Sequence, residues 1–291
     1  MYELIPAGEK TWVIQCPAKI GIYEGGDGVT LIDSGNDKEA AKKAQRILEA
    51  KNWTLKRIIN THSNADHIGG NATLQQRTGC EVWGTGLENA FTQFPHLEPS
   101  FLYGGYPVKE LRNKFLQALP SHPDGDVDDG VFPGLSIFHL PGHFFDMIGV
   151  HTDDDVCFIA DSVFSEQVLQ KYHVNFIYDV QAYLDTLEML RGIQARLFVP
   201  AHAEITDDLG PLLDANRNKV LQIRNLLLDI CRPGLIFEDI LHRVFQHYGL
   251  TMDFNQYVLV GSTIRSYLAW LHNAGSIACE FEQNYLRWIT V

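Results

Sequence analysis

The 291-residue sequence predicts an α+β protein with a first part at residues 1–210 and a smaller, mainly helical C-terminal domain at residues 211–291. Three observations predict this fold class. Short apolar runs separated by turn residues, which are typical of strands, recur in the first part. Some of these runs are separated by segments with the apolar spacing of amphipathic helices. Beyond about residue 209 the strand pattern stops and helical spacing takes over.

The first elements are predicted to be β-hairpins. Within residues 11–32, three short apolar runs alternate with turns. The glycine-rich stretch 25–28 could be mistaken for a phosphate-binding loop, but no helical pattern follows it directly, so a tight turn is predicted. Residues 38–50 carry apolar residues on one side and predict a helix, and Ile58 and Ile59 belong to the next strand.

Residues 91–130 break this regular pattern. Aromatic residues lie there among glycines and prolines. Two interpretations stay open: a lid or pocket wall, or a helical excursion with an ordinary buried face. Long aromatic loops in compact domains tend to be functional, which supports the first interpretation.

The C-terminal domain is predicted to contain three helices, at about 212–230, 235–247 and 255–273, and a short β-pair around 277–289. This order is winged-helix-like. The first helix carries apolar residues such as Leu221, Leu226 and Ile230, so we expect it to pack on the first part or on a second subunit, as in a homodimer. Balanced charge gives the domain no basic recognition face, which argues against DNA binding.

Charge and composition limit the function classes. The net charge is −13, and residues 211–291 hold seven Lys/Arg and seven Asp/Glu, which leaves 16 and 29 of the totals of 23 and 36 in residues 1–210. An acidic surface repels a phosphate backbone, which disfavours nucleic acid as substrate. Five scattered cysteines without a CxxC pair argue against disulfides and a thiolate zinc site. Without a leader pattern or an apolar window of roughly 18 residues, a cytoplasmic protein with no membrane association is expected.

Two imidazoles and a carboxylate, those of His62, Asp66 and His67, lie within six positions of one another. The two histidines are five positions apart and would point to different faces of a regular helix, so they converge only in a loop or a first helical turn. A helix is predicted to begin near Asn71. Neutral imidazole and carboxylate are ligands for zinc and related metals. One such histidine alone is ordinary; the group predicts a metal site.

The same residue types recur after other apolar runs. Each of four residues follows a predicted strand, namely Asp33, His143, Asp161 and His202. Strand ends on one edge of a sheet bring distant parts of the chain into a single concave site. We therefore expect these side chains to lie in one cluster with those of His62 and His67.

In this order, the motifs resemble those of the metallo-β-lactamase superfamily. The family pattern is an Asp after an early strand, H-x-H-x-D-H, a Gly-His, an Asp and a late His. The matching residues are Asp33, His62, Asp66, His67, Gly142-His143, Asp161 and His202. The resemblance spans about residues 10–205. It implies a four-layer αββα sandwich for the catalytic domain at residues 1–210, with a one- or two-metal hydrolytic centre.

The sequence departs from the family pattern at Asn64, which stands where the second His of the motif is expected. The resemblance implies a first metal site at His62, position 64 and His143, a second at Asp66, His67 and His202, and a bridging Asp161. Asparagine offers only a neutral amide oxygen, a weaker donor than imidazole. We expect a weakened first site. The alternative is that Asn64 coordinates through its oxygen or a water and the pair of ions binds normally.

The resemblance also implies the chemistry. A metal-activated hydroxide would attack a small-molecule ester, thioester or lactone, and Asp66 would orient the hydroxide. Asp33 would not bind the metal itself but would fix the orientation of one of its ligands. One or two divalent ions are expected, with zinc preferred over iron or manganese, which the donor set does not exclude. The alternatives are a nuclease acting on phosphodiesters and a metal-binding protein without hydrolytic activity.

Overall fold

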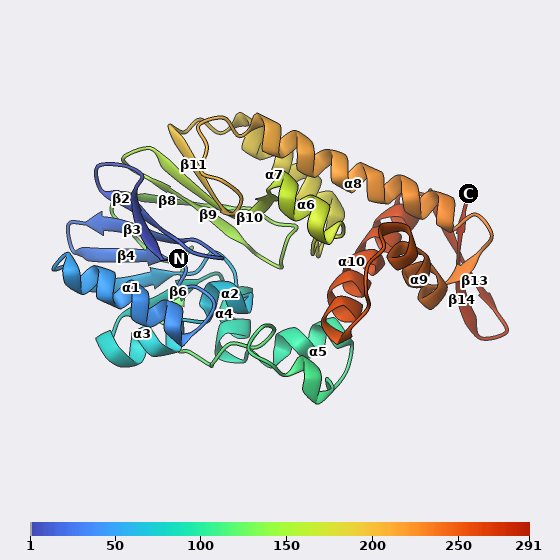
Figure 1. The fold of residues 1–291 in the computed structure, drawn as a ribbon, viewed down its shortest axis with the longest axis horizontal. Helices are drawn as coiled ribbons and strands as arrows, with labels where there is room; N and C mark the ends of the chain where they lie inside the picture. The colour runs from blue at the N-terminus through green and yellow to red at the C-terminus, as the bar shows by residue number, and fades with distance from the viewer. Residues whose placement is uncertain (1) are drawn as a thin grey trace.

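Two mixed β-sheets packed face to face form the centre of the protein in the computed structural model, which describes residues 2–291 (Figure 1). The first sheet has seven strands in chain order, β1 (Glu3–Pro6), β2 (Thr11–Gln15), β3 (Ile20–Gly25), β4 (Gly28–Ile32), β5 (Leu55–Ile59), β6 (Glu81–Gly84) and β7 (Gly125–Asp126). The second sheet has the order β11-β10-β9-β8 and consists of β8 (Leu135–His139), β9 (Ile148–Thr152), β10 (Val156–Phe164) and β11 (Leu197–His202). The predicted hairpins at residues 11–32 are β2, β3 and β4, which pair antiparallel in succession.

Alternating side chains of the first sheet enter two different cores because neighbouring residues of a strand face opposite sides. Ile32 and Ile59 pack between the sheets, against Val150 and Phe158 of the second sheet. Their chain neighbours, including Leu31, face the helices on the outside. Both faces of this sheet are therefore buried, which explains why its strands are nearly continuous apolar runs.

Helices cover both outer faces and complete four layers. On the first sheet lie α1 (Lys38–Ala50) and α3 (Asn71–Thr78), and on the second lie α6 (Glu166–Tyr172), α7 (Val180–Gly192) and α8 (Gly210–Ile230) (Figure 1). Helix α1 has the predicted bounds and is capped by Asp37, whose carboxylate accepts from the backbone N–H groups of Glu39 and Ala40. The αββα sandwich expected from the family resemblance is confirmed.

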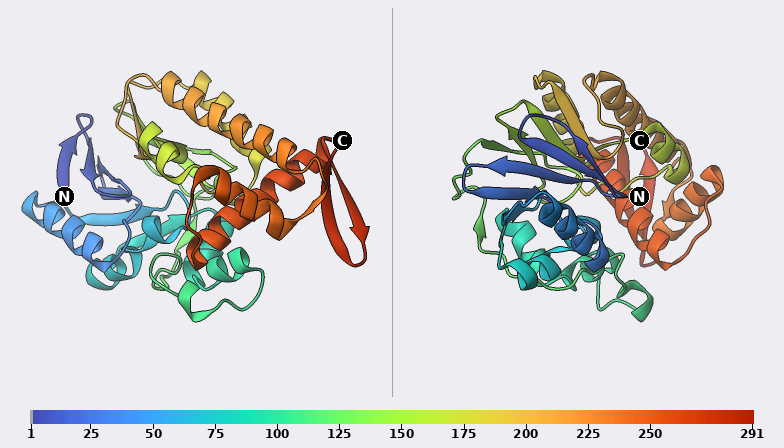
Figure 2. Two further views of the ribbon diagram at one scale, coloured as in Figure 1. Left: turned by 45° about the vertical axis from the view of Figure 1, so that its right-hand side comes forward. Right: turned by 60° about the vertical axis from the view of Figure 1, so that its left-hand side comes forward.

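The C-terminal helical region contains α8, β12 (Leu235–Ile236), α9 (Phe237–Tyr248), α10 (Phe254–Asn273), β13 (Ile277–Glu282) and β14 (Tyr285–Thr290). The three strands form a small sheet in the order β12-β14-β13. Its hairpin β13–β14 lies at the end of the molecule farthest from α1 (Figure 1; Figure 2, left). The order helix, strand, helix, helix and hairpin agrees with the winged-helix-like interpretation, which stays a prediction, as does the division into two domains after residue 210.

Two details of this region differ from the sequence prediction. The predicted second helix begins two residues later, because Leu235 and Ile236 pair with β14. The apolar stripe chosen on α8 is also displaced: Leu221 and Leu226 are half-buried, and the residues that reach the core are Leu213, Val220, Ile223, Leu227 and Ile230. Leucine occurs on three sides of this helix, so composition alone did not identify the buried face.

Each interpretation of residues 91–130 is correct for a part of the segment. Helices α4 (Gly86–Gln93) and α5 (Leu97–Tyr103) and the 3-10 turn at Lys109–Leu111 form a helical excursion. Phe101 of α5 is packed against Phe144 and Phe145. In the irregular part, Phe115 is 60% exposed and lines a cavity, as a pocket wall would.

Candidate metal centre

The loop after β5 is held in place by a buried carboxylate. Asp33 directly follows β4, has a left-handed backbone conformation (φ 62°) and is 3% exposed. Its two oxygens accept hydrogen bonds from the backbone N–H and the hydroxyl of Thr61, both at 2.7 Å, and from Nδ1 of His67 at 2.8 Å. Strands β4 and β5 run parallel, so their ends meet at one edge of the sheet, and Asp33 fixes the loop that carries the predicted ligands.

Hydrogen bonds also orient the three most deeply buried imidazoles. Nδ1 of His67 donates to Asp33, Nδ1 of His143 donates to the carbonyl oxygen of Phe176 at 3.0 Å, and Nδ1 of His62 lies 3.1 Å from the Thr61 hydroxyl oxygen. The Thr61 hydroxyl proton is committed to Asp33, so this oxygen accepts from His62. In each neutral ring the Nε2 lone pair is then free to face the cluster, as in protein metal sites.

The ligand-type side chains form two groups, and Asp161, which belongs to the first, also lies close to the second. His62, His143 and Asp161 form one group, and Asp66, His67 and His202 form the other, with the ligand atoms of each group within 4.8 Å of one another. Asp161 Oδ1 is 3.1 Å from Nε2 of His67, and Asp161 Oδ2 is 3.2 Å from Nε2 of His202 and 3.5 Å from Nε2 of His143. The structure therefore brings all six predicted ligands together.

The backbone is irregular at Asp161 and next to His143. Asp161 lies inside β10, where the pairing with β11 shifts register on either side of Ala160, and not at a strand end as expected. Asp161 is thus presented by an irregularity in a fully buried strand. His143 follows Gly142, which has φ 120° and packs so closely on α7 that a Cβ would collide with the backbone of Tyr183.

Burial and charge act in opposite directions on these groups. Burial alone lowers the pKa of His202, but the carboxylates of Asp161 and Asp66 outweigh it and raise that pKa to about 10. Burial would raise the pKa of Asp66, yet the neighbouring His67 and His202 hold it far below its usual range. Burial and the neighbouring His67 lower the pKa of His62. The cluster therefore balances its carboxylates with imidazolium charge, a role that a bound cation can take over.

Unsatisfied polar atoms show that the residues fit a divalent metal. Nε2 of His62 is buried and makes no hydrogen bond among the described residues, and Nε2 of His67 and Oδ1 of Asp161, although 3.1 Å apart, make none either. Such atoms are costly to leave unpaired. Imidazole and carboxylate donors converging on one point are typical of zinc and similar ions.

Residues beyond the predicted ones also hold this site. Glu88 of α4 accepts from the backbone N–H of Ser63 at 2.9 Å and from that of Asp146 at 2.8 Å, and so connects the loops carrying His62 and His143. Burial raises the pKa of Glu88 to about 7. Glu98 of α5 accepts from the side-chain amide of Asn64 at 2.8 Å. Sequence reasoning missed both acids because a buried carboxylate on a helix has no distinguishing spacing.

A cavity of about 560 Å³ opens on the side of Asp66 and His202. Its wall includes the aromatic side chains of Phe115, Phe164 and Tyr172 and the lysines Lys114 and Lys171. Asp66, with a side chain 39% exposed, faces this side, whereas His62 is fully buried. A substrate in this cavity would approach the second group of ligands first.

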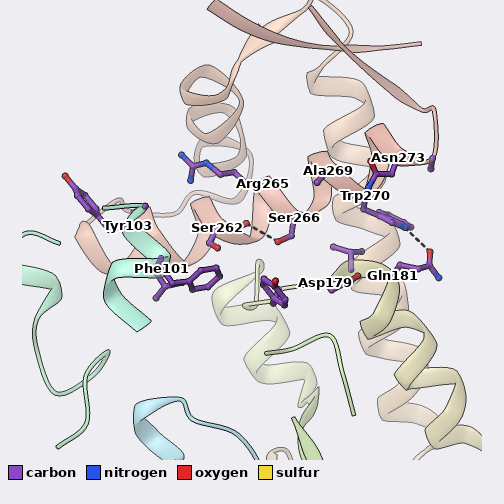
Figure 3. A pocket seen from close by; sticks show the side chains of 15 residues that line it. Phe101, Tyr103, Asp179, Gln181, Ser262, Arg265, Ser266, Ala269, Trp270 and Asn273 are labelled. Atoms are coloured by element: carbon purple, nitrogen blue, oxygen red, sulfur yellow. Dashed lines mark hydrogen bonds between the residues drawn. The ribbon is translucent and has the colours of Figure 1, made fainter. Parts of the chain in front are cut away.

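A larger cavity of about 1050 Å³ lies elsewhere, between α5, α7 and α10 (Figure 3). Trp270, which donates to Gln181, and Phe101 lie along it. Phe101, Phe145 and Tyr178 form an aromatic cluster beside it, and none of the six predicted ligands lines this cavity. Cavity size alone therefore does not identify the candidate site.

Fold and site together define a class of protein, an αββα sandwich with a buried His/Asp cluster at the edge of its sheets. The family model described as the metallo-beta-lactamase superfamily matches residues 13–202, and the chain belongs to this superfamily. The class of enzyme expected from the sequence is thereby confirmed at the level of the superfamily, which implies divalent metal ions.

The curated relatives include several named hydroxyacylglutathione hydrolase. The protein of Methylococcus capsulatus is 38% identical over 125 residues, which cover 41% of this chain and 47% of the relative. That of Bradyrhizobium sp. is 45% identical over 140 residues, covering 48% and 46%. GloC of Haemophilus influenzae is 31% identical over 146 residues, covering 49% and 65%. The chain thus spans about half the length of the curated relatives that it matches.

Two solved structures share the fold over nearly the whole chain. A beta-lactamase domain protein from Burkholderia ambifaria superposes with a TM-score of 0.75 at 15% identity, covering 99% of this chain and 94% of that one. A metallo-beta-lactamase family protein from Thermus thermophilus gives 0.71 at 16% identity, covering 100% and 98%. The C-terminal helical region is therefore shared with these two structures.

Proposed function

We propose that the protein is a zinc-dependent hydrolase of small-molecule thioesters. The convergence of the six ligand-type side chains beside the 560 Å³ cavity carries this proposal. In this proposal, His62, His143 and Asp161 would hold one ion and Asp66, His67 and His202 would hold a second. The names of the curated relatives support a thioester, since hydroxyacylglutathione is one.

The cavity supports a substrate with an apolar acyl part and an acidic thiol part. Phe115, Phe164 and Tyr172 offer apolar surface to the acyl group. Lys114 and Lys171 bring two positive charges to the wall of a cavity in a protein of net charge −13. Lys114 already pairs with Asp37 at 3.0 Å, which leaves Lys171, positioned over the Tyr172 ring, as the better partner for a substrate carboxylate.

When bound, a divalent ion lowers the pKa of water and polarises the thioester carbonyl. The protein's own groups then orient the reactants. Asp66 is the ligand on the cavity side, and its carboxylate stays ionised because its pKa is far below the usual range. Asp66 can accept a hydrogen bond from the attacking water and direct its lone pair toward the carbonyl carbon. Asp33 keeps His67 in the tautomer that presents Nε2.

The charges argue against nucleic acid as the substrate. A nuclease needs a basic surface for its phosphate backbone, and residues 211–291, with equal numbers of basic and acidic residues, do not supply one. Among residues 2–291, which the structure describes, no helix combines the length and apolar character needed to cross a bilayer. The expected homodimer and the cytoplasmic location stay predictions.

A substrate panel tests the proposal. The zinc-loaded protein is assayed against S-lactoylglutathione, an acyl-coenzyme A, an aromatic lactone and a bis-aryl phosphodiester. We expect kcat/KM for a thioester to exceed that for the phosphodiester by at least about 100-fold, which is about 2.7 kcal/mol of transition-state selectivity. Faster turnover of the phosphodiester or the lactone than of either thioester would refute the proposal. Asp66→Asn, which keeps the size of the side chain, distinguishes turnover by this site from contaminating activity.

A further inference from the structure

Asn64 occupies the N-cap position of α2 (Ala65–Ile68) but does not cap it. An asparagine at this position ordinarily accepts a backbone hydrogen bond, an interaction that stabilises a helix by about 1 kcal/mol. Here the side chain turns elsewhere: Nδ2 donates to Oε1 of Glu98 at 2.8 Å, and Oδ1 lies 3.2 Å from Nε2 of His143. The Asn64 side chain therefore contacts Glu98 and His143 instead of capping its own helix.

The contact between Asn64 and His143 brings two acceptors together. Nδ1 of His143 must carry a proton, because its partner, the Phe176 carbonyl oxygen, can only accept. In the neutral ring, Nε2 therefore carries no proton and its lone pair is an acceptor. The amide oxygen of Asn64 is also an acceptor, since its NH₂ group is used by Glu98. Two lone pairs 3.2 Å apart repel each other unless a cation lies between them and attracts both.

Nothing in the Asn64 amide itself selects this orientation. Rotation by about 180° would exchange Oδ1 and Nδ2 and let the amide donate to His143, so the choice depends on the other partner. That partner is Glu98, which is 5% exposed on α5 and offers an acceptor to Asn64. A buried carboxyl group is costly unless it is hydrogen-bonded, and Asn64 supplies such a bond to Glu98.

We infer that Glu98 is a positioning residue that holds the Asn64 amide oxygen toward His62, His143 and Asp161, and so makes Asn64 a ligand of the first metal ion. The inference rests on the metal centre of the proposed function and extends it to the residue that departs from the family motif. Glu98 Oε1 accepts a hydrogen bond from the Asn64 amide and so fixes its orientation, as an acceptor next to a ligating histidine commonly fixes the ring. The first ion then has four protein donors instead of three.

Zinc titration against a chelating dye, with no substrate present, tests this inference. In Glu98→Leu the amide is free to rotate and donate to His143, so we expect the affinity of the weaker zinc site to fall by at least about tenfold, the usual range for losing a partner behind a ligand. The affinity of the stronger site should stay unchanged. Equal weakening of both sites, or of neither, would overturn the inference.

Three further variants separate orientation from general loosening. Glu88→Gln is the matched control, since Glu88 is also a buried acid holding this loop but contacts Ser63 and Asp146 instead of Asn64. Glu88 connects the loops that carry His62 and His143, so a loss of affinity that comes from loosening these loops appears in Glu88→Gln as well, and it should be smaller than the loss in Glu98→Leu. In Asn64→Asp the side chain presents an oxygen in either rotation, so adding Glu98→Leu to it should cost less than about threefold, well short of the loss expected for removing a partner behind a ligand. Glu98→Gln, which can accept or donate, should lie between the wild type and Glu98→Leu.

A measurement on the unmodified protein keeps the test independent of how the variants fold. Oxygen coordination polarises a carboxamide, so the ¹³C and ¹⁵N resonances of the Asn64 side chain should shift when the second equivalent of zinc binds. Unshifted resonances would contradict the inference. Because no substrate is involved, failure of the thioesterase assay with these shifts present would disprove the proposed activity alone.

Discussion

The two groups of predicted ligands differ in burial, in donors and in access. His62 and His143 are almost fully enclosed, lie beside Asn64, and contribute no carboxylate of their own apart from the shared Asp161. On the other side, Asp66 and His202 are partly exposed and border the cavity. The enclosed side therefore depends on how neighbouring residues orient neutral donors, whereas the open side combines a complete donor set with access to substrate.

The shared residue provides the strongest test of this comparison. Asp161→Asn removes a charge that lies close to Nε2 of His67, His143 and His202, so both sides should lose metal. We expect zinc content below one equivalent and a fall in thioesterase kcat/KM larger than the roughly 100-fold seen when a residue behind a metal ligand is replaced. Metal analysis and steady-state kinetics measure these effects. A variant that retains two ions would show that Asp161 does not join the two sides.

Glu88, which holds the loops of the enclosed side, should make the free energy of unfolding of the metal-free protein depend on pH. Burial raises the pKa of Glu88 to about 7, above its ordinary value of 4.5, so the folded protein binds this proton more tightly than the unfolded chain. The contribution of Glu88 is therefore fully present below about pH 4.5 and is lost as pH rises to about 7, by roughly 3 kcal/mol. Denaturant unfolding of the wild type and Glu88→Gln across this range measures it. Parallel curves would contradict the assignment.

The departure from the family motif can be reversed. Asn64→His replaces an oriented amide by imidazole, a stronger donor for zinc, and its Nδ1–H can still donate to Glu98. We expect the weaker zinc site to tighten by about tenfold, while the affinity of the stronger site changes little. Titration of the metal-free proteins side by side provides the measurement. Equal affinities for both ions in the wild type, unchanged by the substitution, would show that the two sides do not differ in the way described.

The smallest expected effect is on the open side. Lys171→Gln removes an exposed charge from the cavity wall, and exposed ion pairs contribute at most about 1 kcal/mol, so KM for S-lactoylglutathione should rise up to about fivefold with kcat unchanged. The rise should shrink at high salt. Lys42→Gln, on α1, serves as the control for a lysine away from the cavity. A change in kcat without a change in KM would place Lys171 nearer the reacting atoms than the structure does.

Strand-end residues were predictable because their signal is local. Asp33, His62 and His202 end or follow apolar strands, and parallel pairing alone then brings such positions to one edge. Asp161 was found by its residue type and its order in the motif, but its place within an irregular strand was not expected, since all nine residues of β10 are buried and nothing in the sequence indicates a register shift. The helix at residues 38–50 was predicted to the residue because its apolar face is well separated.

Long-range polar contacts could not be predicted. Glu88 and Glu98 contact the metal loop across 25 and 34 positions of sequence, and either could have been an ordinary surface acid of a short helix. The same holds for Phe176, whose backbone carbonyl orients His143 and which has no side-chain signal for that role. The predicted weakness of the first site depended on the donor type of Asn64 alone, without the neighbour that orients it.

The apolar core of the second sheet has a consequence for the order in which the chain folds during synthesis. Met147, Cys157 and Ile159 belong to the same core as Leu227 of α8 and Ile277 at the start of β13. The outer face of β10 therefore stays partly uncovered until α8 and Ile277 have left the ribosome. Such exposed apolar surface favours aggregation of unfinished chains. Slowing translation after residue 210 should consequently lower the yield of native protein more than slowing it before β8.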